Sequence, residues 1–332
     1  MITACSGITE KPADFPTWVS GSSQHYPSSL YLTGQGTGLT LNDAKERARA
    51  DLAKQFQVAV QERSHQSQQF KSQQIQGETS RSLNQQVSRS LLSYTSRSLE
   101  GVEIVQQWHN KQSNQYYALA ALSRPKANQQ FSQQISSLDK EIQHALDQAR
   151  QETNVLRKAS LVQNAIEAHR QRMEIQRSLQ VVDPTGRGIP TTMTLTELQK
   201  TQKEFISQIK LSSEVVEATD DSLPRMLDAE ISRAGFTMSS PGKADYQLIL
   251  ETFLDPVIRE QGWFWLRGTL ELRLTQPTGN NVGVQRWPLK VSATTEPRAK
   301  QRLVDAIQEI LAKELPSTLM GFSKSKLNPS DG

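Results

Sequence analysis

The chain has 332 residues, of which 36% are hydrophobic and 22% are charged, with 38 lysines and arginines against 34 aspartates and glutamates. This length predicts roughly two or three domains, and the low hydrophobic fraction favours an elongated protein with exposed arms. Basic and acidic residues are intermixed, without the basic stripe and interleaved aromatic residues typical of nucleic-acid-binding proteins, so we expect no nucleic-acid partner. No run of about eighteen apolar residues is present, so no segment is predicted to span a bilayer.

The only cysteine, Cys5, ends the short sequence Ile2–Cys5, which reads Ile-Thr-Ala-Cys. This order of a branched apolar residue, two small residues and a cysteine resembles a lipobox, whose cysteine thiol receives a diacylglycerol. The alternative is an ordinary cysteine near a frayed terminus. A secretory signal also carries a basic region and an apolar region of about seven to fifteen residues, and neither precedes Cys5. We therefore expect that the true start lies upstream of Met1 or that the start has been trimmed.

The stretch from Tyr31 to Val60 is the best patterned part of the N-terminal region. An apolar run at Tyr31–Leu32 predicts a strand, and the three glycines of Gly34–Gly38 predict a tight turn after it. Thr40 is a predicted N-cap, and apolar residues spaced three and four apart over Leu41–Phe56 predict a helix of about four turns. Alternation over Phe56–Val60 then predicts a second strand.

The glycine loop has two interpretations. A glycine-rich loop between a strand and a helix is where nucleotide phosphates bind, so one alternative is a nucleotide-using enzyme with its site at Gly34–Gly38. The loop reads G-x-G-x-G, without the third glycine at the required spacing, and no P-loop motif is present. We favour a structural role, in which the glycines let the chain reverse and let a helix of small residues pack close to a strand.

A set of short segments in the N-terminal third forms a recognisable series: Pro16–Val19, Tyr31–Gly36, Asp43–Ala44, Ala50–Ala53, Leu99–Ile104 and Tyr116–Ala120. These segments resemble a family of bacterial envelope lipoproteins, the Lpp-twenty type, over roughly residues 15–125, and also the N-terminal domain of the flagellar assembly protein FlgT. The resemblance implies a fold and a location in the envelope, with no catalytic residues. Because Ser6 follows Cys5 where an aspartate would be a retention signal, it also implies sorting to the outer membrane, facing the periplasm.

The stretch Gln61–Arg97 is rich in glutamine, serine and arginine and has few large apolar residues. We interpret it as two long arms that project past the core, with disorder as the alternative that the same composition fits. Alternation of apolar residues predicts strands over Val102–Trp108 and Tyr116–Leu122. Together with the elements predicted above, these strands define a small α+β domain over residues 15–125, preceded by a lipobox and tether over residues 1–14.

From Lys126 to Val181 the chain contains no glycine or proline, and its apolar residues follow a near-heptad spacing over Phe131–Ala149. We predict two helices with a break near Asn154, arranged as an antiparallel hairpin or as one long rod. His144 and His169 have no acidic or histidine partner at i+4 and are expected to face solvent. A linker rich in glycine and proline follows, so residues 126–190 are predicted to form a helical spacer.

The last part of the chain predicts an α/β domain over residues 191–322 and a tail over residues 323–332. A short helix around Thr196–Gln208 leads into a strand at Leu211–Val216 and a helix that ends at Gly235. Three strands and a final helix follow, so the order is strand, helix, three strands, helix. The fold class predicted for the whole chain is α+β.

A search for catalytic arrangements finds none. The sequence has no G-x-S-x-G motif, and its five histidines include no pair at metal-ligand spacing. We therefore expect no enzyme activity, no cofactor and no metal. The most aromatic stretch is Trp263-Phe264-Trp265, in which alternation places Phe264 on the opposite face from the two tryptophans. We predict that these residues anchor a protein partner, since interfaces are enriched in Trp and Phe; core packing is the alternative.

These observations predict a non-catalytic lipoprotein, anchored in the outer membrane through Cys5, that serves as an adaptor or scaffold for other envelope proteins. The C-terminal domain is the expected binding head. Two alternatives are kept: a structural or assembly accessory of an envelope machine such as the flagellar basal body, and the nucleotide-using enzyme at Gly34–Gly38. The sequence does not specify the partners, and oligomerisation is compatible with it.

Overall fold

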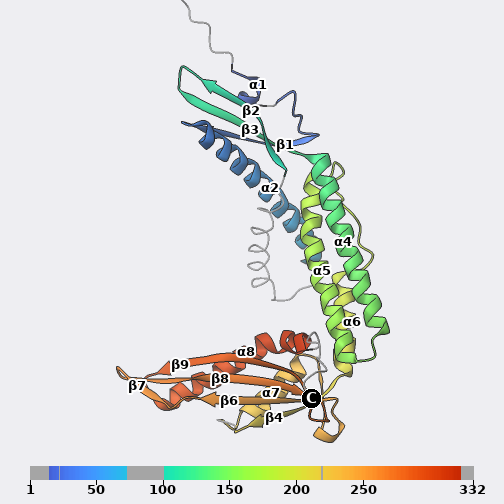
Figure 1. Ribbon diagram of the computed structural model, residues 1–332, viewed down its shortest axis with the longest axis vertical. Coiled ribbons are helices and arrows are strands. Elements are labelled where there is room, and N and C mark those ends of the chain that lie inside the picture. The colour runs from blue at the N-terminus through green and yellow to red at the C-terminus, as the bar shows by residue number, and fades with distance from the viewer. Residues whose placement is uncertain (1–14, 22, 73–100, 218–219, 323–332) are drawn as a thin grey trace, which may run out of the picture. The chain divides into compact units, whose positions relative to one another are not determined.

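The computed structural model describes residues 15–21, 23–72, 101–217 and 220–322 and shows an α+β fold (Figure 1). The predictions for Cys5, for the tether, for residues 73–97 of the arms and for the tail lie outside the described residues. The chain divides into two compact units. The first combines Met1–Asp139 with Arg170–Thr191, and the second combines Lys140–His169 with Thr192–Gly332.

The first unit is built on a three-stranded antiparallel sheet in the order β1-β3-β2. Its strands are β1 (Tyr31–Gly38), β2 (Val102–Asn110) and β3 (Gln115–Ser123). The helix α2 (Leu41–Ser72) lies along one face, as Figure 1 shows. Small and apolar side chains of α2, spaced four apart from Ala44 to Val60, are buried against this face. The predicted apolar stripe is thus the buried stripe of the helix.

The three glycines lie inside β1 and face α2, and the predicted tight turn at Gly34–Gly38 is wrong. A Cβ atom added to Gly36 would lie 2.1 Å from the carbonyl oxygen of Ala44 and 2.2 Å from the amide nitrogen of Ala48. The helix backbone therefore packs directly on the strand backbone, which a side chain at Gly36 would prevent. The structural interpretation also predicted that a helix of small residues packs closely on a strand, and this part is confirmed.

The strand predicted at Phe56–Val60 is also wrong, because α2 continues as a helix through Ser72. Phe56 and Val60 are buried whereas Val58 between them is exposed. Residues four apart share one face of a helix and residues two apart share one face of a strand, so the spacing of Phe56 and Val60 fits both structures. The following glutamines favour helix over strand, which settles the ambiguity.

The opposite face of this sheet is covered by the N-terminal segment with the short helix α1 (Thr17–Ser20). Its Trp18 is buried, and the side-chain amide of Gln35 in β1 donates a hydrogen bond to the Trp18 carbonyl oxygen at 2.5 Å. Residues of α2 cover the free edge of β1. Asp51 accepts a hydrogen bond from the Gln35 amide, and Arg47 donates one to the carbonyl oxygen of Thr37. This edge is therefore protected against pairing with another strand.

The helical stretch forms an antiparallel hairpin of α4 (Arg124–Gln151) and α5 (Val155–Val182), which lie side by side in Figure 1. Pro125 sits in the first turn of α4, where its missing amide hydrogen costs nothing, so it begins the helix. His144 is exposed, as predicted. His169 is buried, contrary to prediction, because α5 is enclosed on more than one side and carries buried polar residues as well as apolar ones.

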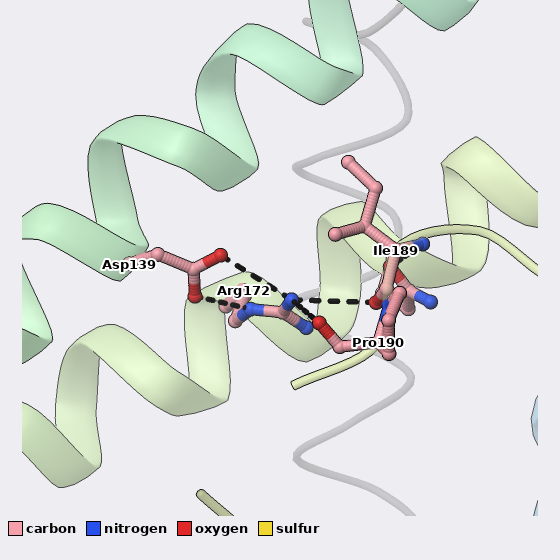
Figure 2. Close-up of polar contacts among 5 residues, drawn as sticks. Asp139, Arg172, Ile189 and Pro190 are labelled. Atoms are coloured by element: carbon pink, nitrogen blue, oxygen red, sulfur yellow. Dashed lines mark hydrogen bonds and ion pairs between the residues drawn. The ribbon is translucent and has the colours of Figure 1, made fainter. Parts of the chain in front are cut away.

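Arg172 of α5 is the largest fully buried side chain in the described part of the protein, with 1% exposure. Figure 2 shows its polar contacts. Its Nε atom donates a hydrogen bond to Asp139 of α4 at 2.6 Å. Its Nη2 atom donates to the backbone carbonyl oxygens of Ile189 and Pro190 at 3.3 and 3.0 Å. One guanidinium thus joins both helices and the segment that follows them, and its charge is balanced by a carboxylate.

The second unit contains a six-stranded mixed sheet in the order β5-β4-β6-β8-β7, with β9 on the other edge of β8. The strands are β4 (Lys210–Val216), β5 (Thr237–Met238), β6 (Tyr246–Leu254), β7 (Ile258–Glu260), β8 (Trp263–Thr275) and β9 (Asn281–Ala293). The helices are α6 (Leu195–Gln208), α7 (Leu223–Arg233) and α8 (Glu296–Phe322). Only β5 and β7 were not predicted, because two or three residues are too few for a periodic pattern.

One face of this sheet forms the core of the second unit. Alternate residues of β8 from Leu266 to Leu274 pack with apolar side chains of α7 and α8. Helix α7 ends where predicted, with Gly235 at φ +94° after its last turn. A capping box between Thr194 and Glu197 fixes the start of α6. The intervening β8 residues point to the opposite face, on which the candidate site lies.

Replacing Gly36 with alanine should destabilise the first unit. The new methyl group would overlap backbone atoms of α2, and overpacking of this kind costs about 1–3 kcal/mol. Urea unfolding, followed by circular dichroism, measures the change. Gly242→Ala is the control, since a Cβ atom there meets nothing within 4 Å. Equal stability of Gly36→Ala and the wild type would contradict the close packing of β1 on α2.

Candidate functional site

The N-terminal glycines offer no loop for a nucleotide, because they lie within β1 and the α2 backbone fills the space beside them. Within the described ranges, no group of three His, Cys, Asp or Glu side chains is placed to hold a metal ion. No described helix is both long enough and apolar enough to cross a membrane. Attention therefore turns to the aromatic segment at the start of β8.

The structure places Trp263, Phe264 and Trp265 on two faces of β8, as alternation predicted. Trp263 is 41% exposed, and Trp265 is half-buried on the same face. Phe264 points the other way and packs against the core of the second unit. The two interpretations of the segment therefore apply to different residues: Phe264 has the core role, and the tryptophans lie on the face without covering helices.

Strand pairing gathers further residues around these tryptophans. Ile258 of β7 lies opposite Trp265, and Phe253 of β6 lies opposite Thr269, four residues farther along the same face of β8. Ile258 is 46% exposed and Phe253 is 47% exposed. Large apolar side chains that protrude singly are common, but a group of them on one face indicates an interaction site.

Two cations complete the group. Arg267 of β8 lies opposite Lys290 of β9, in the row after Trp265. The Arg267 guanidinium lies 5.6 Å from the centroid of the Trp265 ring, and the Lys290 ammonium lies 5.5 Å from it. Such contacts are attractive because a cation faces the negative face of the π-system. We call Phe253, Ile258, Trp263, Trp265, Arg267 and Lys290 the aromatic–cationic surface.

Farther along the same face, charged residues neutralise one another. Glu271 accepts hydrogen bonds from Arg273 and from Arg286, the latter at 2.6 Å, and Arg273 also lies 3.7 Å from Glu251. The Arg273 hydrogen bond is the largest cause of a lowered pKa of the Glu271 carboxyl, and Arg286 acts in the same direction. This ion-pair row is neutralised within the protein, whereas Arg267 and Lys290 form no ion pair with the residues that the structure describes.

Sequence reasoning identified the tryptophans but missed the four other members of the surface. Phe253, Ile258 and Lys290 belong to three different strands, and only the pairing register brings them beside β8. Arg267 carried a signal, since it is two and four residues from the tryptophans and so shares their face. Chemically, the surface can bind a partner through apolar contact and charge.

The family comparison concerns the N-terminal third of the chain. Residues 16–123 match the model of the LPP20 lipoprotein family, which confirms the predicted resemblance of the N-terminal third to bacterial envelope lipoproteins. No curated protein matches the chain.

Three solved structures illustrate what the chain resembles. A secreted protein from Helicobacter pylori shares 17% identity over 85% of this chain and 98% of that chain, with a TM-score of 0.43. A minor lipoprotein from Acinetobacter baumannii shares 21% identity over 34% of this chain and 90% of that chain, with a TM-score of 0.27. A lipoprotein from Neisseria meningitidis shares 12% identity over 31% of this chain and 98% of that chain, with a TM-score of 0.23.

The ion-pair row should make stability depend on acid pH. Because folding lowers the pKa of Glu271, its contribution is present above the ordinary glutamate pKa and is lost as the pH falls through the lowered value. Glu271→Gln removes this titration, so its stability should fall less than that of the wild type between about pH 7 and about pH 3. Urea unfolding at both pH values measures this difference.

The control for this experiment is Glu309→Gln, at an exposed position of α8 that forms no ion pair in the described part of the chain. It should keep the pH dependence of the wild type. An identical loss of stability on acidification in Glu271→Gln and the wild type would show that the row does not hold the Glu271 carboxylate.

Proposed function

We propose that this protein is a non-catalytic, lipid-anchored adaptor of the bacterial envelope, attached to the outer membrane and facing the periplasm. The observation that carries the adaptor role is the aromatic–cationic surface of the second unit. Trp and Arg are among the side chains that most often dominate the free energy of protein–protein binding, especially when clustered. The family match of residues 16–123 supports a lipoprotein of the envelope.

In this proposal the two ends of the chain have different functions, membrane attachment and partner binding. Cys5 carries the lipid, and the second unit binds another envelope protein. Trp263 and Trp265 are the proposed contact residues, whereas Phe264 supports the strand from the core side. An adaptor needs rigid presentation of its contact residues, and strands β6, β7, β8 and β9 hold the surface in a paired sheet.

The lipid anchor is tested by metabolic labelling. Cells that express the chain behind a complete lipoprotein signal peptide are given a fatty-acid analogue that can be coupled to a dye. The wild type should be labelled and Cys5→Ser should not, because the thiol is the proposed attachment point. Equal labelling of both proteins would contradict the anchor.

Protein binding is tested by photo-crosslinking in intact cells. Benzoylphenylalanine is introduced in place of Trp263, or in place of Leu39, an exposed residue of the first unit that serves as the control. Illumination should join the protein to an envelope protein from position 263 and give no such adduct from position 39. The adaptor proposal fails if position 263 gives no protein adduct.

A further inference from the structure

We infer that the aromatic–cationic surface recognises an extended, acidic segment of its partner protein, in which an acidic side chain is flanked by apolar ones. This inference rests on the proposed adaptor function and specifies the chemistry of the partner. It depends on three features of the second unit: two cations that form no ion pair with the described residues, the order of side chains along β8, and the hydrogen-bonding groups at the β9 edge of the sheet.

The first feature is the charge of Arg267 and Lys290. Both side chains are exposed, and neither forms an ion pair within the described ranges. Four other charged residues on this face, Glu251, Glu271, Arg273 and Arg286, neutralise one another. Arg267 and Lys290 are directly opposite each other on β8 and β9, and each lies within 5.6 Å of the centroid of the Trp265 ring. A carboxylate that reaches this row meets two cations, and charge-assisted hydrogen bonds to either one are strong.

The second feature is the order of side chains along the face. A row with Trp265 and Ile258 is followed by the row of Arg267 and Lys290, and then by a row with Phe253. Successive rows are two residues apart, which is about 7 Å along a strand. An extended segment that runs along β8 has the same spacing between side chains on one face. An acidic residue at the cation row thus places apolar residues, two positions before and after it, on the apolar rows.

The third feature is the edge of the sheet formed by β9, which is a poor place for a partner segment to pair as an additional strand. Pro288 lies in the middle of β9 and has no amide hydrogen to offer. Arg302 of α8 donates a hydrogen bond to the carbonyl oxygen of Ser292 on this strand. An added strand would lose hydrogen bonds at both positions, so the exposed face is the more favourable place for a partner segment.

An anionic bilayer fits this face less well than a protein does. Glu260 is exposed and lies opposite Trp263 on the same face. Its carboxylate would approach lipid phosphates and be repelled by them. A protein segment can place its acidic side chain at the cation row alone and avoid Glu260.

The test uses the full-length protein with benzoylphenylalanine at position 263. The double variant Arg267→Glu and Lys290→Glu should lower the yield of the protein adduct at least about tenfold, because like charges would then meet. The control double variant Arg225→Glu and Lys313→Glu makes the same change in net charge at exposed positions outside the surface and should keep the wild-type yield. Thermal unfolding checks that both variants are folded.

Mass spectrometry of the adduct then locates the crosslinked segment in the partner, which should contain an apolar-x-acidic-x-apolar pattern. Equal adduct yields from the two double variants, or a crosslinked segment without acidic residues, would overturn the inference and leave the adaptor function standing. Crosslinking to lipid alone would overturn both the inference and the protein-binding role. Absence of any adduct in all proteins would refute the adaptor function itself, and the inference with it.

Discussion

The buried guanidinium of Arg172 is the interaction on which the middle of the chain depends. Burying a charge is costly unless it is paired and fully hydrogen-bonded, and here Asp139 and two backbone carbonyl oxygens meet that need. The pair fixes α5 against α4 and holds the segment after α5 beside them. The same two helices place Phe131 in the core of the first unit and Leu156 in the core of the second. The helical stretch predicted as a spacer is therefore part of both cores.

The two sheets differ in how their faces and edges are covered. In the first unit α2 fills one face, Trp18 and its neighbours cover the other, and side chains of α2 occupy the edge of β1. In the second unit the helices cover one face, and the opposite face keeps exposed aromatic side chains beside two cations that form no ion pair with the described residues. Grouped exposed apolar side chains mark interaction sites, so their concentration on one face supports a binding role there.

Much of the fold followed from the sequence because many elements are long and strongly periodic. The near-heptad spacing in α4, the apolar stripe of α2 and the alternation in β6, β8 and β9 each have one dominant period. Arg172 shows the limit of this reasoning. It is buried between Ala168 and Ile175 of α5, but nothing local reveals that Asp139 would lie opposite it. The strand wrongly predicted at Phe56–Val60 shows that a four-residue interval satisfies both periods.

The sequence by itself determined the α+β class, the resemblance of the N-terminal third to the LPP20 lipoprotein family, the two helices of the hairpin and the position of the tryptophans on one face of a strand. These properties depend on neighbours within a few turns or residues of one element. The tertiary structure alone decided that the glycines lie inside β1 rather than in a turn after it, and that Phe253, Ile258 and Lys290 join Trp265. The reason is physical: strand register and helix docking bring together residues far apart in the chain, and no local pattern encodes such pairings.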